Sequence, residues 1–205
     1  MSILEEGLLH YITHRQLEKL HNTTVLIIGA GGLGSNVAFI LVRSGIKQLV
    51  LVDHDTVAPS NLNRQTYFPN DIGKQKVEAL AKHLLDLEPA LKLECHITQV
   101  NNHNVRIFFG KADIIVEAVD LAPTKVMLCE SAAAIQKPFI TASGITGLGR
   151  GYRNNMVIRR LDTHIFCVGD CQPDDNDNAI PFAPRVIQAA AMQANLVLQH
   201  ILKGE

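Results

Sequence analysis

A polar segment with several cations follows a glycine-rich turn in the first third of the chain. Residues 60–76, SNLNRQTYFPNDIGKQK, carry Arg64, Lys74 and Lys76 and a single carboxylate, Asp71. The planar guanidinium of arginine suits phosphate oxygens, and the lysine ammonium is a compact point charge that serves the same purpose. These residue types favour a site for a polyphosphate, although composition alone leaves an ordinary solvated loop equally open.

The glycine-rich turn lies in VLIIGAGGLGSN, directly after a short β-branched run. Gly29 would allow a tight turn after a strand, Gly31 would let the backbone approach a phosphate, and Gly34 would let the next helix pack closely. The N-terminus of that helix offers free N–H groups to an anion. Asp53 ends the next apolar run, at roughly the 20-residue spacing of an acid that binds ribose hydroxyls. Together these features predict a nucleotide site without specifying the nucleotide.

Alternating strands and helices must position these groups. Apolar, β-branched runs predict buried strands at 24–28, 48–52, 112–119 and 138–142, and an alternating pattern predicts one at 91–97. Periodicity predicts helices from the glycine loop to about Ser44, with Gly45 as the stop, and at 73–87, 124–135 and 183–203, after a helical segment at 1–23. This alternation is typical of parallel β-α-β units. We expect a Rossmann-like α/β fold, a mostly parallel sheet with helices on both faces, in one domain over residues 1–205.

Composition and charge argue against several classes of protein. The 205 residues are 47% hydrophobic with a formal net charge of −1, so bulk charge gives no sign of binding to nucleic acid or a membrane surface. No apolar run reaches the length of about 18 residues that predicts a membrane span, and the first residues do not resemble a secretory signal. The four cysteines, Cys95, Cys129, Cys167 and Cys171, form no disulfide framework, which favours a cytoplasmic setting.

Four motifs in the order GAGGLG, DHDTV, SNLNRQ and DIGKQK resemble the ThiF/MoeB/HesA family, which is related to the ubiquitin-activating enzymes. Later motifs resemble the short ThiF branch associated with thiamine biosynthesis: EAVD at 117–120, ASGITGLG at 142–149, GD at 169–170 and APRVIQAAAMQAN at 183–195. The resemblance covers roughly residues 17–202 and implies a ThiF/MoeB-type adenylation domain. It also implies a crossover loop at 168–184 above the nucleotide.

The resemblance implies an ATP-dependent adenylyltransferase. Such an enzyme activates the C-terminal carboxylate of a small ubiquitin-like sulfur carrier protein, here ThiS-like, as an acyl-adenylate and releases pyrophosphate, for the thiazole of thiamine. The carboxylate is already ionised at neutral pH, so no general base is required. The obstacle is repulsion between an anionic nucleophile and a polyanion, which cations and N–H donors relieve. ATP and Mg²⁺ are the implied cofactors, and a homodimer is the implied assembly.

Residue roles also follow from the resemblance. It implies that Asp53 binds the ribose hydroxyls and that Asn61 and Arg64 contact the phosphates. Lys76 matches the family's phosphate lysine, and Asp120 matches the acid that holds Mg²⁺. The implied catalytic residues are Arg64, Lys76 and Asp120, and the implied nucleotide-binding residues are Gly29, Gly31, Gly32, Gly34, Asp53, Asn61, Asn63, Arg64, Gln65 and Lys76.

Two other interpretations accompany these roles. Asp120 follows a predicted strand and precedes a predicted helix, so it could serve as the N-cap of that helix, alone or in addition to binding a metal. Lys74 does not match the phosphate lysine and is expected to be solvated.

The chain departs from the family pattern at three places. Arg15 lies too close to the first strand to match the N-terminal arginine that many relatives insert into a partner subunit's site. Cys167 and Cys171 are four apart with no second pair, so no zinc is expected. Cys171 lies among carboxylates, which raise a thiol's pKa, so the segment 169–184 is expected to close over the carrier tail as a lid without covalent chemistry.

Three other functions stay open. One is an adenylating enzyme for a different acceptor, either the molybdopterin carrier or a modified tRNA. Another is a nicotinamide-dependent oxidoreductase, which would explain the glycine loop and Asp53 but leave Arg64 and Lys76 without a purpose. The third is a non-catalytic scaffold, against which the presence of Arg64, Lys76 and Asp120 argues.

Overall fold

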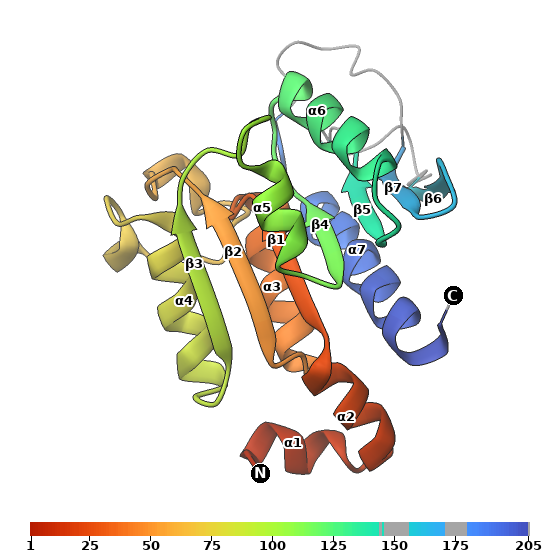
Figure 1. The fold of residues 1–205 in the computed structure, drawn as a ribbon. Helices are drawn as coiled ribbons and strands as arrows, with labels where there is room; N and C mark the ends of the chain where they lie inside the picture. Colours follow the sequence, from red (N-terminus) through yellow and green to blue (C-terminus); the bar gives the residue numbers. More distant parts are fainter. Residues whose placement is uncertain (144, 146–155, 171–179, 205) are drawn as a thin grey trace.

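A single sheet runs through the protein. The computed structural model describes residues 1–143, 145, 156–170 and 180–204 (Figure 1). Within these residues seven strands lie in the order β3-β2-β1-β4-β5-β7-β6. Neighbouring strands are parallel, except that β6 is antiparallel to β7. The strands are β1 (Thr24–Ile28), β2 (Gln48–Asp53), β3 (Lys92–Ile97), β4 (Ile114–Glu117), β5 (Phe139–Ala142), β6 (Val157–Arg160) and β7 (Ile165–Gly169).

Helices cover both faces of the sheet, as expected (Figure 1). On one face Val25 and Ile27 of β1 belong to a core with α3, α4 and α7, and on the other face Leu26 and Ile28 pack with α5 and α6. A strand buried on both faces explains why 24–28 is an unbroken apolar run. The helices are α1 (Ile3–Leu8), α2 (His14–Asn22), α3 (Gly32–Arg43), α4 (Lys76–Leu87), α5 (Val105–Gly110), α6 (Ala122–Ala133) and α7 (Ala183–Lys203), with short 3₁₀ turns at Pro59–Asn61 and Pro69–Asp71.

The winding of the chain reverses between β1 and β4. The chain passes from β1 to β2 and β3 on one side, and then adds β4, β5 and β7 on the other side of β1. In open α/β sheets, such a reversal leaves a crevice at the carboxyl ends of the two central strands, and ligands bind there. The glycine loop follows β1, so the topology brings it to this crevice.

The predicted ends of α3 are confirmed. The helix stops at Arg43, and Gly45 adopts the left-handed conformation with φ of +99°. The N–H of Ile46 donates to the carbonyl of Leu41, and the N–H of Gly45 donates to that of Val42, both at 3.0 Å. This is the Schellman arrangement that ends many helices at a glycine.

One predicted helix boundary is wrong. The helix expected at 73–87 begins at Lys76, because Gly73 has φ of +85° and cannot belong to a right-handed helix. The N–H of Gly73 donates to the carbonyl of Val57, and the N–H of Val57 donates to that of Lys74, both at 2.8 Å. Residues 73–75 therefore pair with the segment after β2, which places Lys76 at the start of α4 and beside the end of β2.

Some elements were not predicted, and some predictions fall outside the described residues. The unpredicted elements are α5, β6 and β7, which are four to six residues long. Residues 171–179, with Cys171 and most of the expected lid, lie outside the described part, as do residues 144 and 146–149 of ASGITGLG. Among the described helices, none combines the length and apolarity that a bilayer crossing requires.

Candidate nucleotide-binding site

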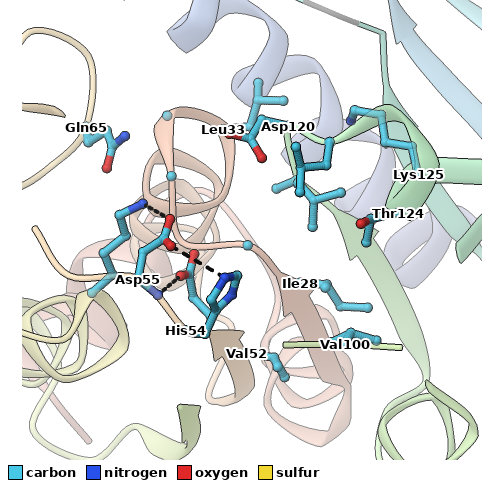
Figure 2. A pocket seen from close by; sticks show the side chains of 18 of the residues that line it. Ile28, Leu33, Val52, His54, Asp55, Gln65, Val100, Asp120, Thr124 and Lys125 are labelled. Atoms are coloured by element: carbon cyan, nitrogen blue, oxygen red, sulfur yellow. Dashed lines mark hydrogen bonds and ion pairs between the residues drawn. The ribbon is translucent and has the colours of Figure 1, made fainter. Parts of the chain in front are cut away.

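A cavity of about 420 Å³ lies at the carboxyl ends of β1, β2 and β4. Figure 2 shows His54 and Asp55 along one side of it and Asp120, Thr124 and Lys125 along the other, with Ile28, Val52 and Val100 together at one end. Nine residues named from the sequence line it: Gly29, Gly31, Gly32, Asp53, Asn61, Arg64, Gln65, Lys76 and Asp120. Gly34 and Asn63 do not. Topology therefore gathers residues that span more than ninety positions of the sequence.

The four glycines of the loop have different surroundings. A Cβ on Gly34 would overlap the carbonyl oxygen of Gly29, and one on Gly29, where φ is +97°, would lie 2.6 Å from the carbonyl oxygen of Ala118. These two glycines are required by packing. A Cβ on Gly31 would meet only the Nε2 of Gln65, at 3.8 Å. Gly31 therefore leaves open space beside the cavity, as expected of a glycine that lets a ligand approach the backbone.

Asp53 holds the glycine loop against the end of β2. Its Oδ2 accepts a hydrogen bond from the N–H of Ala30 at 2.6 Å, and its Oδ1 accepts one from the N–H of Asp55 at 2.7 Å. Each carboxylate oxygen can accept a further hydrogen bond, so Asp53 can still bind a ribose hydroxyl.

At the start of α3, Gly31 is the N-cap and no side chain caps the helix. The N–H groups of the first turn are thus left for a ligand or water.

The two lysines of DIGKQK are placed differently. Lys76 lines the cavity, and its largely buried side chain places Nζ 2.7 Å from Oδ2 of Asp55. This hydrogen bond from Lys76 is the main cause that lowers the pKa of the Asp55 carboxyl. Lys74 lies 3.2 Å from Asp71 with half of its side chain exposed, and it does not line the cavity.

Arg64 sits on the same wall as the glycine loop. Its Nη1 donates to the carbonyl of Ser60 at 3.0 Å and to Oδ1 of Asn63 at 2.8 Å. The Nδ2 of Asn36, on α3, donates to the carbonyls of Arg64, at 3.0 Å, and of Gly32, at 2.6 Å. Asn36 therefore fixes the backbone of the arginine to the helix. The Nε and Nη2 groups of Arg64 have no hydrogen-bond partner among the described residues and can serve an anion.

Two neighbouring amides have separate tasks. The Oδ1 of Asn61 accepts from the N–H of Ala58 at 2.9 Å, which orders the 3₁₀ turn and leaves the Nδ2 of Asn61 for a ligand. Gln65 is about nine-tenths buried, and its Oε1 has no hydrogen-bond partner in the part of the chain that the structure describes. A buried amide oxygen without a partner costs free energy, so this position is suited to a ligand that would complete its bonding.

Asp120 lies at the rim beyond β4 and is exposed. The N-cap of α6 is Leu121 and no side chain caps that helix, so the interpretation of Asp120 as an N-cap is wrong. A carboxylate that is exposed toward the cavity and not engaged as a cap has the donor chemistry that Mg²⁺ requires.

Lys125 is a cavity residue that the sequence reasoning missed. Its Nζ donates to both carboxylate oxygens of the fully buried Glu117, at 2.9 and 3.0 Å, and to the carbonyl of Ala142 at 3.0 Å. Glu117 also accepts from the hydroxyl of Thr141 and from the N–H of Val119. These three acceptors use all three N–H groups of Lys125, so this lysine serves to neutralise the buried Glu117. An acid at a strand end with a lysine eight residues later was the available signal.

The apolar end of the cavity includes a loop that was also missed. Thr98, Gln99 and Val100 line the cavity just after β3. Asn104 shapes this loop: its Nδ2 donates to the carbonyl of Gln99 at 3.0 Å, and its Oδ1 accepts from the N–H of Asn101 at 2.8 Å. The asparagine-rich VNNHN after the strand at 91–97 was the signal, since asparagine favours such local bonds.

A second group of possible metal ligands lies in the cavity. Asp53, His54 and Asp55 present ligand atoms within 4.8 Å of one another. However, both oxygens of Asp53 accept backbone N–H groups, and Asp55 is paired with Lys76. These carboxylates are engaged in holding the loop and the lysine, so the trio is not a strong cation site.

Fold and cavity together define a class: α/β proteins that bind a nucleotide at the carboxyl ends of parallel strands. The model of the ThiF family matches residues 6–204, and the chain belongs to this family of adenylating enzymes. It is 33% identical over 128 residues to the adenylyltransferase and sulfurtransferase MOCS3 of Drosophila willistoni, covering 62% of this chain and 28% of that protein. It is 38% identical over 117 residues to the ubiquitin-like modifier-activating enzyme 5 of Caenorhabditis briggsae, covering 52% and 27%.

Solved structures share the fold. The tRNA N6-threonylcarbamoyladenosine dehydratase TcdA of E. coli, solved with ATP, aligns with a TM-score of 0.89 over 97% of this chain and 93% of that one, at 17% identity. MccB of E. coli, also solved with ATP, aligns with a TM-score of 0.71 over 93% and 59% of the two chains, at 26% identity. The curated relatives are much longer: this chain spans about 28% of their length.

Proposed function

We propose that this protein uses ATP to adenylate the C-terminal carboxylate of a small ubiquitin-like sulfur carrier protein, ThiS-like, for thiazole formation in thiamine biosynthesis. One observation carries the adenylation: a cavity in which an uncapped helix N-terminus, Arg64 and Lys76 converge. Membership of the ThiF family supports the same chemistry. The choice of a ThiS-like carrier rests on the resemblance of APRVIQAAAMQAN and the other late motifs to the short ThiF branch.

The cavity offers a place for each part of ATP. Its apolar end, with Ile28, Val52 and Val100, suits the adenine ring. Asp53 lies between that end and the glycine loop and suits the ribose hydroxyls. The open side of Gly31, together with the N–H groups of α3, suits the phosphates. The adenine, ribose and phosphates of ATP would thus lie in sequence from the apolar end of the cavity to its charged side.

The reaction itself requires charge neutralisation rather than proton transfer. A carboxylate oxygen of the carrier attacks the α-phosphorus, a new O–P bond forms, and the bond to the leaving pyrophosphate breaks with its electron pair. Arg64 donates the N–H groups of Nε and Nη2 to the phosphate oxygens. The ammonium of Lys76 leaves its ion pair with Asp55 and binds the phosphates instead. These contacts are stronger in the transition state, where charge shifts to the leaving group.

We also propose a Mg²⁺ ion held by Asp120. The exposed carboxylate at the rim of the cavity is the oxygen donor that a hard cation prefers. When bound, Mg²⁺ supplies positive charge near the phosphates. Asp120→Asn should therefore raise the magnesium concentration needed for half-maximal ATP binding.

We further propose one adenylation domain over residues 1–205 that acts as a homodimer in the cytoplasm. Arg15 lies on α2 beside a groove at the amino ends of the strands, so it does not reach the nucleotide cavity of its own chain. Light scattering on the purified chain tests the dimer: a monomer at micromolar concentration would contradict it.

Pyrophosphate exchange tests the function. Labelled pyrophosphate should enter ATP only when a carrier of the ThiS type is added, in a panel that also contains a molybdopterin-type carrier and a modified tRNA. Arg64→Ala should lower the exchange rate on the order of 10²-fold, the range seen when one electrostatic donor is removed. Exchange with the molybdopterin-type carrier alone, or with the tRNA alone, would redirect the proposal to that acceptor. NADH binding with no response to ATP would contradict adenylation altogether.

A further inference from the structure

Asn63 joins two segments that are far apart in the sequence. Its Oδ1 accepts a hydrogen bond from Nη1 of Arg64 at 2.8 Å, and its Nδ2 donates to the carbonyl of Pro181 at 3.2 Å. The orientation of the amide follows from the chemistry of its partners, because a guanidinium only donates and a carbonyl only accepts. Asn63 itself is exposed and does not line the cavity.

The segment of residues 180–182, which leads into α7, forms part of the cavity wall. Pro181 lines the cavity, and so does Val186 in the first turns of α7. Val186 packs against the glycine loop so closely that a Cβ on Gly32 would lie 2.9 Å from its Cγ1. A displacement of this wall would therefore move the carbonyl that Asn63 binds.

Arg64 depends on Asn63 for its orientation. Both hydrogens of Nη1 are used, one by the carbonyl of Ser60 at 3.0 Å and one by Asn63. These two bonds fix the plane of the guanidinium, which sets the direction of the remaining N–H groups. The chain of contacts runs from the carbonyl of Pro181 through the amide of Asn63 to the guanidinium of Arg64.

We propose that Asn63 is a positioning residue: it couples the guanidinium of Arg64 to residues 180–182, so that Arg64 is aligned for the α-phosphorus only while this wall is seated. The inference rests on the proposed adenylation and adds a means by which the position of residues 180–182 controls the rate of the reaction. It separates Asn63 from the direct phosphate ligands, since its amide is engaged on both sides and lies outside the cavity.

The test compares three substitutions at Asn63. Asn63→Ala removes both bonds, and Asn63→Asp keeps an acceptor for Arg64 but turns an oxygen toward the carbonyl of Pro181. Both should leave the Kd for ATP, measured without carrier, within about threefold of the original. Both should lower kcat of carrier adenylation on the order of tenfold to a hundredfold, the effect of a small misplacement of a catalytic group. Asn63→Gln, which keeps the amide, should recover part of the loss.

A matched control is Asn70→Ala, which truncates an exposed asparagine in the neighbouring 3₁₀ turn and should change neither quantity. Loss of ATP affinity with unchanged kcat in Asn63→Ala would make Asn63 a nucleotide ligand and overturn the proposal. Full activity of Asn63→Asp would overturn the link to Pro181. If the original protein adenylates no carrier, the proposed function fails by itself. Amide hydrogen exchange then decides the coupling: Asn63→Ala must speed exchange at residues 182–187, and unchanged exchange overturns it.

Discussion

The buried pair of Glu117 and Lys125 makes a strong prediction about stability. Glu117 is fully buried, and the ammonium of Lys125 lies 2.9 and 3.0 Å from its two oxygens. In Lys125→Met the carboxylate keeps the hydroxyl of Thr141 and the N–H of Val119 but loses its counter-charge. Removal of one partner of a buried ion pair destabilises a protein by about 3–5 kcal/mol. At about 2–4 °C per kcal/mol for a domain of this size, Tm should fall by roughly 6–20 °C.

The double variant Glu117→Gln/Lys125→Met separates charge from packing. Glutamine keeps an oxygen acceptor for the N–H of Val119, and its amide N–H group can donate to the hydroxyl of Thr141. Because this side chain carries no negative charge, most of the lost stability should return. Urea unfolding without ATP measures both variants. The control is Lys137→Met, because Lys137 donates to the carbonyls of Phe109 and Ala112 and, among residues 1–143, 145, 156–170 and 180–204, neutralises no carboxylate. It should lose less than Lys125→Met.

Two results would refute this reasoning. A double variant no more stable than Lys125→Met would show that the charge of Glu117 is not the cause of the loss. The second result concerns the ligand: since the N–H groups of Lys125 are all used by protein acceptors, the double variant should bind ATP within about threefold of the original. A loss on the order of tenfold or more would mean that Lys125 serves the phosphates.

Three more predictions follow from single positions. Gly31→Ala should fold with a nearly unchanged Tm but bind ATP at least about tenfold more weakly, whereas Gly34→Ala should fail to fold stably, as thermal melts with and without ATP would show. Lys76→Met should abolish carrier adenylation while Lys74→Met leaves it within about threefold, and equal losses in the exchange assay would contradict the placement. Burial alone would raise the pKa of Asp71, but hydrogen bonds to its carboxylate lower the pKa to about 2. The ionised carboxylate therefore adds to the free energy of unfolding above about pH 4, and this contribution is lost as the pH falls toward 2. Asp71→Asn should flatten that part of the plot of unfolding free energy against pH, measured by urea titration.

The fold was largely predictable because its elements have strong local patterns. The β1 run is apolar on both faces, and the sequence TVLII already indicates a strand buried on two sides. Gly45 stops α3 by a backbone rule that holds for a glycine in any protein. By contrast, β6 is exposed along its whole length, so no buried apolar face marks it in the sequence, although it pairs with the very next strand, β7. A short edge strand carries little signal of its own.

The composition of the site was predictable only where a motif marked it. The resemblance named Arg64 and Lys76, and both line the cavity. The asparagine-rich VNNHN indicates a loop after β3, but it does not identify residues 98–100 as cavity residues, because only the parallel pairing of β3 with β2 brings this loop to the crevice. Lys125 was missed for a related reason: a lysine in a helix is usually solvated, and its carboxylate partner lies at the end of a strand.

The resting partner of Lys76 explains how one lysine can be both preorganised and available. Its side chain is largely buried, which by itself disfavours an ammonium, but Asp55 provides a counter-charge 2.7 Å away. The carboxylate of Asp55 is 52% exposed, so water can solvate it once the lysine leaves. Ion pairs with such an exposed partner contribute only about 0–1 kcal/mol, far less than a fully buried pair. A polyphosphate with several charges therefore displaces Asp55 readily, whereas a buried partner such as Glu117 would have kept the lysine from the nucleotide.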